Sequence, residues 1–317
     1  MYNILIPNIM FILILFFTGC DTKSKNNKSF QPEIIQDINL TNYPQTLILK
    51  IGKRRLNIDM NTTIRVYTKE NKDITDKVEW IIKPKEAVKI EKRRLIAKED
   101  VNVTIMARYK NEISNKERVE IYWEVDGHRV PPKPDPKKNN STLLGVDVNK
   151  NGVRDDVERW IYKKYSKYYP CRQELDYNNT AIIDGEVIPS AKIICEKKAV
   201  PYHPAVRAAM MDVARAAQII IKDPKKAKET DVIFTKAYAC AMVIEELKDN
   251  KGRKLVQDNI NWKEFEEVQF NTVKRARAYA KFNYYLSGGV YMVPPEKYIL
   301  KNWCSPKVKE LIKGLRE

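Results

Sequence analysis

The chain is poor in histidine and glycine, and these shortages exclude several kinds of active site. Its 317 residues include 2 His and 10 Gly. His128 lies beside a Pro-rich stretch, and His203 precedes Pro204 at an expected helix start. Neither has a Ser or Cys context, which favours capping or surface roles over catalysis. No Gly-rich phosphate loop is present, so the sequence offers no nucleotide-binding motif.

The first twenty residues, MYNILIPNIMFILILFFTGC, contain no charged side chain. Their apolar core is short for a membrane span and suits a signal peptide, with an uncleaved N-terminal anchor as the alternative. The final FTGC motif resembles the lipobox of bacterial lipoproteins. The resemblance implies a signal peptide over residues 1–19, cleavage before Cys20, and acylation of that cysteine. The protein is therefore expected to be lipid-anchored to a membrane of the bacterial cell envelope, periplasmic or surface-exposed.

The chain has five cysteines. Apart from Cys20, they lie in the C-terminal half of the chain. They form no CxxC pair and have no nearby His at zinc-ligand spacing, so a zinc cluster is not expected. An even number of cysteines in an exported protein predicts two disulfides, with three possible connectivities. The pairing that is local in sequence is favoured, and it joins Cys171 to Cys195 and Cys240 to Cys304.

Positive charge dominates, with 58 Lys and Arg against 41 Asp and Glu and a net charge of +17. Such an excess can attract nucleic acid, anionic lipid or acidic glycans. However, no stretch interleaves basic and aromatic residues as a nucleic-acid-binding face does. Lys, Asn and Ile are abundant throughout, so a general Lys-rich composition is the favoured explanation. No nucleic-acid partner is expected.

Residues 37–127 follow a polar tether at 20–36, and their short apolar runs alternate with a period of two. Runs rich in Val, Ile, Thr and Tyr, such as TTIRVYT, predict an all-β sandwich. LKIGKRRLNI, DITDKVEW, VKIEKRRLIA and VNVTIMARYKNEIS followed by RVEIYWEV resemble a group-2 bacterial immunoglobulin-like domain. The resemblance implies a spacer or adhesion module without catalysis. The residues expected to face the core are Ile64, Val66, Trp80, Ile90, Ile105, Val119 and Ile121.

Residues 128–145 are expected to form a semi-rigid linker, because their prolines favour extended backbone. Beyond the linker, apolar residues recur at spacings of three and four, which predicts a mostly α-helical domain over residues 146–317. Its helices cover PAVRAAMMDVARAAQIII, DVIFTKAYACAMVIEEL and WKEFEEVQFNTVKRARAYAKFNYYL, the second apolar nearly all round like a central helix. The Asp-Gly turn of IIDGEVI predicts a hairpin. The fold class is multidomain, an immunoglobulin-like sandwich followed by a disulfide-containing helical domain.

The most specific motif is DVNKNGVRDDVE, which begins at Asp147 and opens the helical domain. Oxygen-bearing side chains alternate along it, with Gly152 at the sixth position and Glu158 at the last. A loop around calcium turns alternate side chains inward and supplies about six to eight oxygens, including a bidentate carboxylate. Glycine permits the sharp turn. The expected ligands are Asp147, Asn149, Asn151, the carbonyl of Val153, Asp155 and Glu158.

Only the exiting helix of an EF-hand, VERWIYKKYSKYY, is present, because the Pro-rich segment cannot supply the entering helix. The motif therefore resembles the loop-plus-helix calcium motifs of dockerin-like and thrombospondin type 3-like segments. The alternative is an Asn-rich turn in which Asp155 or Asp156 caps the helix without an ion. Capping does not account for every ligand position, so calcium with a structural duty is the expected cofactor.

Two functions remain open. The favoured one is a non-enzymatic, calcium-binding cell-envelope lipoprotein, whose spacer presents the helical domain to an envelope or surface protein or to a glycan. The other is an envelope enzyme acting on glycans or peptidoglycan through the helical domain. The adjacent carboxylates Glu245-Glu246 and Glu266-Glu267 point different ways on a helix, so no catalytic residue is predicted. A deep pocket that gathers polar side chains would favour the enzyme.

Overall fold

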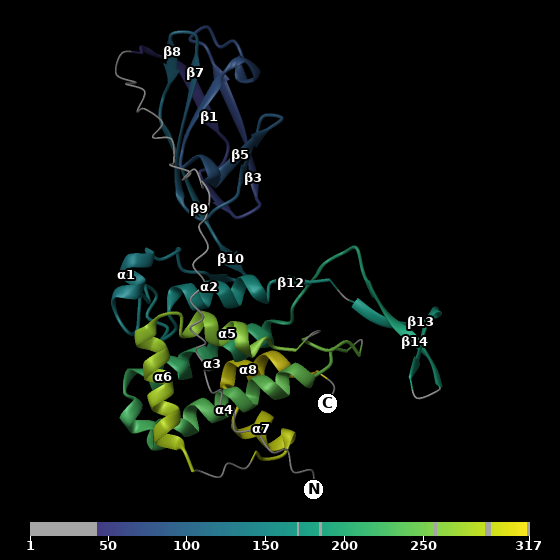
Figure 1. The fold of residues 1–317 in the computed structure, drawn as a ribbon. Coiled ribbons are helices and arrows are strands. Elements are labelled where there is room, and N and C mark those ends of the chain that lie inside the picture. The colour runs from purple at the N-terminus through teal and green to yellow at the C-terminus, as the bar shows by residue number, and fades with distance from the viewer. Residues whose placement is uncertain are drawn as a thin grey trace, which may run out of the picture.

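The computed structural model describes residues 43–169, 171–183, 186–250, 252–256, 259–288 and 293–315. The predicted signal peptide, Cys20 and the tether at 20–36 lie outside these residues. Two hydrophobic cores are present, one among strands from Leu47 to Ile121 and one among helices from Val153 to Val308. The chain is thus a β region followed by a helical region (Figure 1). No helix in the described part of the chain is long and apolar enough to span a membrane.

The β region is built around one mixed sheet with the strand order β2-β9-β7-β8-β1-β3-β6-β5, and β4 pairs with β7. Most neighbouring strands are antiparallel, whereas β1 with β8 and β2 with β9 are parallel. The strands are β1 (Gln45–Ile51), β2 (Arg55–Asn57), β3 (Asn61–Tyr67), β4 (Glu79–Lys83), β5 (Val88–Glu91), β6 (Arg94–Ala97), β7 (Asn102–Tyr109), β8 (Glu112–Ser114) and β9 (Glu117–Tyr122), with 3-10 turns η2 (Thr75–Lys77) and η3 (Lys85–Ala87).

In the central strands of the β region, the period-two pattern correctly predicts which residues face the core. The buried ones are Ile64, Val66, Ile105, Val119 and Ile121. Trp80 and Ile90 only pack partly buried against this core, because β4 pairs with β7 alone and β5 ends the sheet. Burial of each such Ile or Val side chain contributes about 1.5–3 kcal/mol, so this core is held by apolar contacts without a cysteine.

Helices make up most of the C-terminal region, and α3 lies at its centre, packed against α2, α4, α6 and α8. This corrects the expectation that the next helix, α4, is central, since Val232 and Ile233 in its first half are exposed. The elements are α1 (Pro136–Ser141), α2 (Asp155–Lys164), α3 (Pro204–Lys222), η4 (Pro224–Lys226), α4 (Ala227–Glu246), α5 (Trp262–Gln269), α6 (Val273–Leu286), α7 (Glu296–Asn302) and α8 (Pro306–Ile312). The third expected helix is divided into α5 and α6 because Thr272 caps α6.

The Pro-rich segment 128–145 is extended only in part. It begins in the short hairpin of β10 (Glu124–Val125) and β11 (His128–Arg129), and it later forms α1. Proline at the first position of a helix is favourable, and Asp135 caps α1 by accepting the N–H of Lys138 at 2.9 Å. The buried guanidinium of Arg275 in α6 donates to the carbonyl oxygens of Asn139 and Leu143. The segment is therefore fastened to the helical region.

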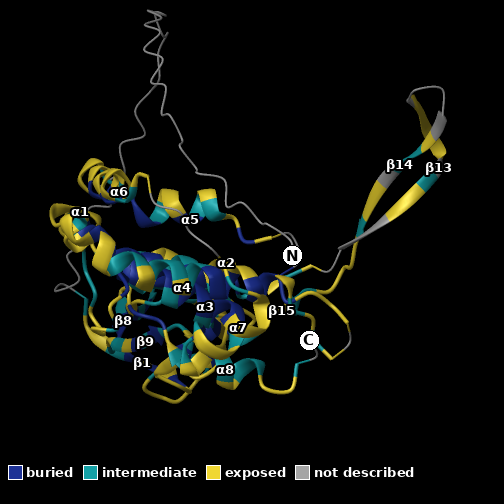
Figure 2. Cartoon of the chain, turned by 90° about the horizontal axis from the view of Figure 1, so that it is seen from below, coloured by how far each residue is buried: buried dark blue, intermediate teal, exposed yellow. Residues whose placement is uncertain are grey.

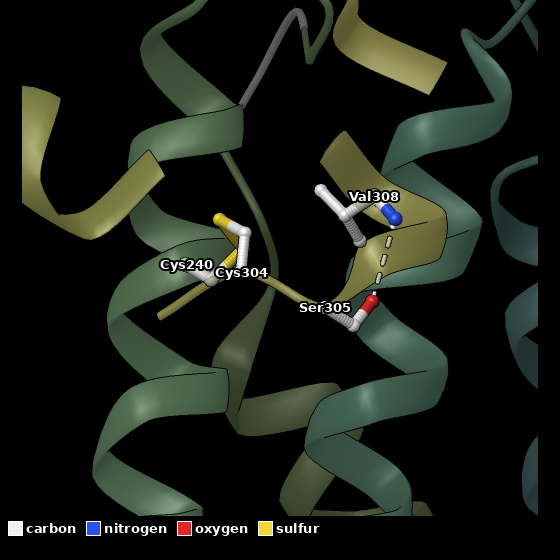
Figure 3. Close-up of a disulfide and its surroundings, with 4 residues drawn as sticks. All are labelled: Cys240, Cys304, Ser305 and Val308. Atoms are coloured by element: carbon white, nitrogen blue, oxygen red, sulfur yellow. Dashed lines mark hydrogen bonds between the residues drawn. A yellow bond between two sulfur atoms is a disulfide. The ribbon is translucent and has the colours of Figure 1, made fainter. Parts of the chain in front are cut away.

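One predicted disulfide is confirmed, because Cys240 of α4 is bonded to Cys304 after α7 (Figure 3). Ser305 follows at once and caps α8 by accepting the N–H of Val308. The bond closes a 64-residue separation and holds the C-terminal helices on α4.

The predicted hairpin is also present, formed by β13 (Cys171–Ile183) and β14 (Glu186–Cys195). Its register places Cys171 opposite Cys195, and Cys195 is disulfide-bonded. The pair β12 (Lys167–Tyr168) and β15 (Val200–Pro201) lies at its base. The hairpin extends away from the helices as an arm (Figures 1 and 2).

Candidate metal centre

The predicted calcium ligands lie in the loop between α1 and α2 and in the first turn of α2, which contains Asp155 and Glu158. Gly152 has a φ of +84°, in the left-handed region where a Cβ atom is strained. A Cβ there would also lie 3.1 Å from Cγ of Arg215 in α3. The Nε of Arg215 donates to the carbonyl of Asn151 at 2.9 Å, which holds the turn against the helical core. Glycine at this position thus permits both the turn and the close approach of α3.

Short hydrogen-bonded turns curl the loop from its first residue. Asp147 accepts the backbone N–H groups of Asn151 at 3.2 Å and Gly152 at 2.9 Å. Asn149 accepts the same Asn151 N–H at 3.2 Å, and Asn151 accepts the N–H of Val153 at 2.8 Å. Asn and Asp side chains that bond to the backbone two residues onward stabilise such turns. Their succession turns alternate side chains towards the same interior.

The Glu158 carboxylate is fully buried and is the point on which the other groups converge. Asn151 donates its Nδ2 to Oε2 at 2.6 Å, and Asn149 donates its Nδ2 to both oxygens at 3.3 and 3.4 Å. Nε2 of His128, from β11, lies 2.5 Å from Oε1. Three of the predicted ligand residues therefore meet here, together with a histidine that the sequence pattern did not select.

Asp155 lies fully buried in the first turn of α2. Its carboxylate accepts the N–H of Val148 at 3.0 Å, and its own N–H donates to the carbonyl of Val146 at 2.8 Å. Burial raises the pKa of Asp155 to about 6; the Val148 hydrogen bond opposes this, and the charges of Asp147 and Glu158 add to it. The loop thus gathers carboxylates that disfavour one another's ionisation, which a bound cation would relieve.

Neither Asp155 nor Asp156 is the N-cap of α2. The N-cap position of α2 is Arg154, whose side chain makes no capping bond. Asp156 accepts the N–H of Val157 at 2.9 Å and Nδ2 of Asn139 at 2.8 Å, and it pairs with the guanidinium of Arg154. Asp155 instead points back into the loop through its bond to the Val148 N–H. The tenth loop position is therefore occupied by a structural carboxylate, separate from the predicted ligands.

The donor chemistry of the loop fits a hard cation. No Lys or Arg in the described ranges forms an ion pair with Asp147, Asp155 or Glu158. Carboxylate and amide oxygens are the groups that calcium prefers. In the loop the amide nitrogens of Asn149 and Asn151 face Glu158, and their oxygens accept backbone N–H groups. The side chain of Val153 is buried in the helical core. Within the described residues, no three His, Cys, Asp or Glu side chains form a metal-holding group by themselves. The predicted set depends equally on Asn and backbone oxygens.

A shallow depression of about 540 Å³ lies elsewhere on the helical region, beside the end of α4 and the start of α7. Its charged lining consists of Glu246, Lys248, Glu296 and Lys297, which are exposed, and the partly buried Asp249, which forms an ion pair with Arg253. Exposed charges are solvated, so this lining does not create the buried polar environment in which catalytic groups are activated. The loop before α2 is therefore the stronger candidate site.

Comparison with known proteins gives no family for this chain. No family model matches it, and no curated protein matches it. A solved structure described as a polysaccharide lyase is similar over 84% of this chain and 34% of that chain, with 13% sequence identity and a TM-score of 0.18. The chain thus spans about a third of the length of that structure. A TM-score this low defines no common fold.

Proposed function

We propose that the chain is a non-enzymatic, calcium-binding lipoprotein of the bacterial cell envelope. An immunoglobulin-like sandwich over residues 37–127 would act as the spacer, and the helical domain would be the part that it presents. The antiparallel strands around β7 and the cysteine-free apolar core support the spacer role. The FTGC motif ending at Cys20 supports the anchor, because acylation there would tether the chain to a membrane.

The observation that carries the calcium proposal is the convergence of Asn149 and Asn151 on the buried carboxylate of Glu158, with the carboxylate of Asp155 buried in the same turn of α2. A buried carboxylate is costly unless it is paired or hydrogen-bonded. Among the described residues, the side chains that bond to the Glu158 carboxylate are two amides and an imidazole, and a divalent cation would supply the positive charge that they lack. The residues that would hold the ion are Asp147, Asn149, Asn151, Val153 through its carbonyl, Asp155 and Glu158.

The ion's role would be structural, because the loop joins the end of the Pro-rich segment to the first turn of α2. Two Asn at the third and fifth positions reduce the ligand charge and should weaken affinity. Extracellular calcium modules tolerate dissociation constants of about 10⁻⁴–10⁻³ M. An exported protein with this loop would therefore be loaded outside the cytoplasm.

Thermal unfolding in millimolar calcium, in magnesium and in chelator tests this proposal. Calcium that binds only the folded chain must raise the unfolding temperature. Magnesium should raise it little, because it demands tight octahedral geometry and releases its waters reluctantly. Identical unfolding curves in calcium and chelator would contradict calcium binding and leave a hydrogen-bonded turn.

We further propose that the helical domain engages an envelope partner through its projecting arm. Leu175 and Ile193 are exposed two register steps apart on the hairpin, and Ile182 and Ile188 are exposed nearer its turn. Exposed apolar side chains on a projecting element favour contact with a partner. This supports a protein partner more than a glycan. Pull-down from envelope extracts with the wild type and with an Ile182→Ser/Ile193→Ser variant tests it. The same proteins recovered with both baits would contradict a role for the arm.

A further inference from the structure

We infer that His128 is a positioning residue of the calcium site, so that the site is complete only when the β region is docked on the helical region. The inference rests on the proposed calcium binding and adds to it a residue that no loop pattern contains. His128 belongs to β11, the strand that follows the β region, and lies 30 positions before Glu158. It therefore links the site to the other part of the molecule.

Two contacts with one face of α2 hold the His128 ring in place. Nε2 lies 2.5 Å from Oε1 of Glu158, and the ring stacks on Tyr162 with centroids 4.6 Å apart and planes 19° apart. Glu158 and Tyr162 are four residues apart, so they project from the same side of the helix. A ring fixed by stacking and bonded to a ligand carboxylate is the arrangement by which outer groups orient metal ligands.

Arg159, which follows Glu158 in α2, contacts the β region. The guanidinium of Arg159 forms an ion pair with Asp100, with one N–O distance of 2.8 Å, and donates to the carbonyl of Pro131 at 2.8 Å. It also lies over the ring of Trp123, 5.2 Å from the centroid. Glu158 thus contacts the loop, and the residue after it, Arg159, contacts the β region.

A second contact fixes the turn of the hairpin formed by β10 and β11 to the helical region. Asp126 in its turn forms an ion pair with the buried Arg207 of α3, which also donates to the carbonyl of Tyr165 at 2.6 Å. His128 is therefore brought to Glu158 by a hairpin fixed at both ends, and its position depends on the docked arrangement.

Docking and calcium binding must then be linked in both directions. A change that loosens the docked β region withdraws His128 from Glu158 and weakens calcium binding. Equally, calcium on Glu158 must favour the docked arrangement, because coupling between two equilibria is reciprocal.

Calorimetric titration of calcium into the full mature chain tests this linkage. His128→Ala should raise the dissociation constant about tenfold, the lower end of the effect of removing an outer-sphere partner. His128→Gln should recover part of the affinity, because its amide can donate to the carboxylate. Asp100→Asn touches no loop residue but breaks the pair with Arg159, so it should weaken binding in the same direction. Asp59→Asn, on an exposed turn of the β region, is the matched control and should leave the constant unchanged.

Small-angle scattering supplies a second measurement, with a broader distribution of shapes expected in chelator than in calcium. Absence of binding by the wild type would overturn the calcium proposal and this inference together. Binding by the wild type with unchanged constants in His128→Ala and Asp100→Asn would overturn this inference alone. Weakening by His128→Ala without any effect of Asp100→Asn would overturn the linkage to docking.

Discussion

Nδ2 of Asn151 lies 2.6 Å from Oε2 of Glu158, so the fifth and twelfth loop positions face each other across the loop interior. The relationship places an amide of the turn against the carboxylate of the helix that follows. Because of this hydrogen bond, a change in the charge of Glu158 should alter the stability of the loop.

Replacing Glu158 by Gln should remove most of the calcium-dependent stabilisation. For a ligand at about 100 times its dissociation constant, that stabilisation is roughly 2.7 kcal/mol in the wild type. The variant loses the charge of Glu158 and one of the two oxygens that would bind the proposed ion. Denaturant unfolding in calcium and in chelator measures the difference.

Asp156→Asn is the matched control, an identical chemical change two residues away. Asp156 pairs with Arg154 and accepts from Asn139, so its loss should lower stability in chelator. The gain in its free energy of unfolding on adding calcium should nevertheless equal that of the wild type. If Glu158→Gln kept the full calcium-dependent gain in the free energy of unfolding, Glu158 would not be a calcium ligand.

The disulfide between Cys240 and Cys304 should account for a large share of the stability of the helical domain. Linking residues 64 apart restricts the unfolded chain by about 4 kcal/mol in the loop-entropy estimate. The double variant Cys240→Ala/Cys304→Ala should therefore unfold at markedly lower denaturant. Thiol titration of the denatured, unreduced mature wild type should detect no free thiol. Two or more reactive thiols would contradict the predicted pair of disulfides.

Arg275 should be indispensable for the attachment of α1. Its fully buried guanidinium donates to carbonyls at Asn139 and Leu143, and burial lowers its pKa to about 10. Arg275→Met leaves buried carbonyls without donors and should cost about 3 kcal/mol. Limited proteolysis within residues 136–145 should accelerate as well. Arg277→Met, exposed on the same helix, should change neither measurement.

Stability should fall in mild acid through His203. Its Nδ1 caps α3 by accepting the N–H of Ala205 at 3.3 Å, and burial, with the charge of Arg207, lowers its pKa. The unfolded chain then takes up this proton before the folded chain. The contribution is complete above about pH 6.5 and is lost as the pH falls through the folded pKa.

His203→Asn isolates this effect, because Asn is a good N-cap that does not titrate. Unfolding free energies measured in chelator between about pH 5 and 8 should fall less steeply for the variant than for the wild type. Parallel curves would assign the acid sensitivity to other groups.

Cys20→Ser tests the proposed anchor. The variant should appear in the soluble fraction or accumulate as an unacylated precursor, since the acyl chains would be attached to this cysteine. Fractionation and intact mass measure both outcomes. A variant that stays membrane-bound at the wild-type mature mass would exclude a lipoprotein.

Short-range pattern predicted much of the fold. Alternation located Ile64 and Val66 in the core, the Asp-Gly turn located the β13–β14 hairpin, and the local cysteine pairing located the Cys240–Cys304 bond. Of the residues that the loop motif selected, Asn149 and Asn151 contact Glu158. These features depend on neighbours in sequence, where periodicity and turn chemistry act directly.

Tertiary structure alone decided which helix is central and what surrounds the loop. Both α3 and α4 are apolar, and packing on several sides buries α3 more deeply. His128 meets Glu158 across 30 positions, and Arg275 meets Asn139 across 136. No local pattern encodes such pairs, because they depend on how separate elements dock. The sequence determined the loop motif for which calcium is proposed, and only the tertiary structure brought His128 against the carboxylate of its last position.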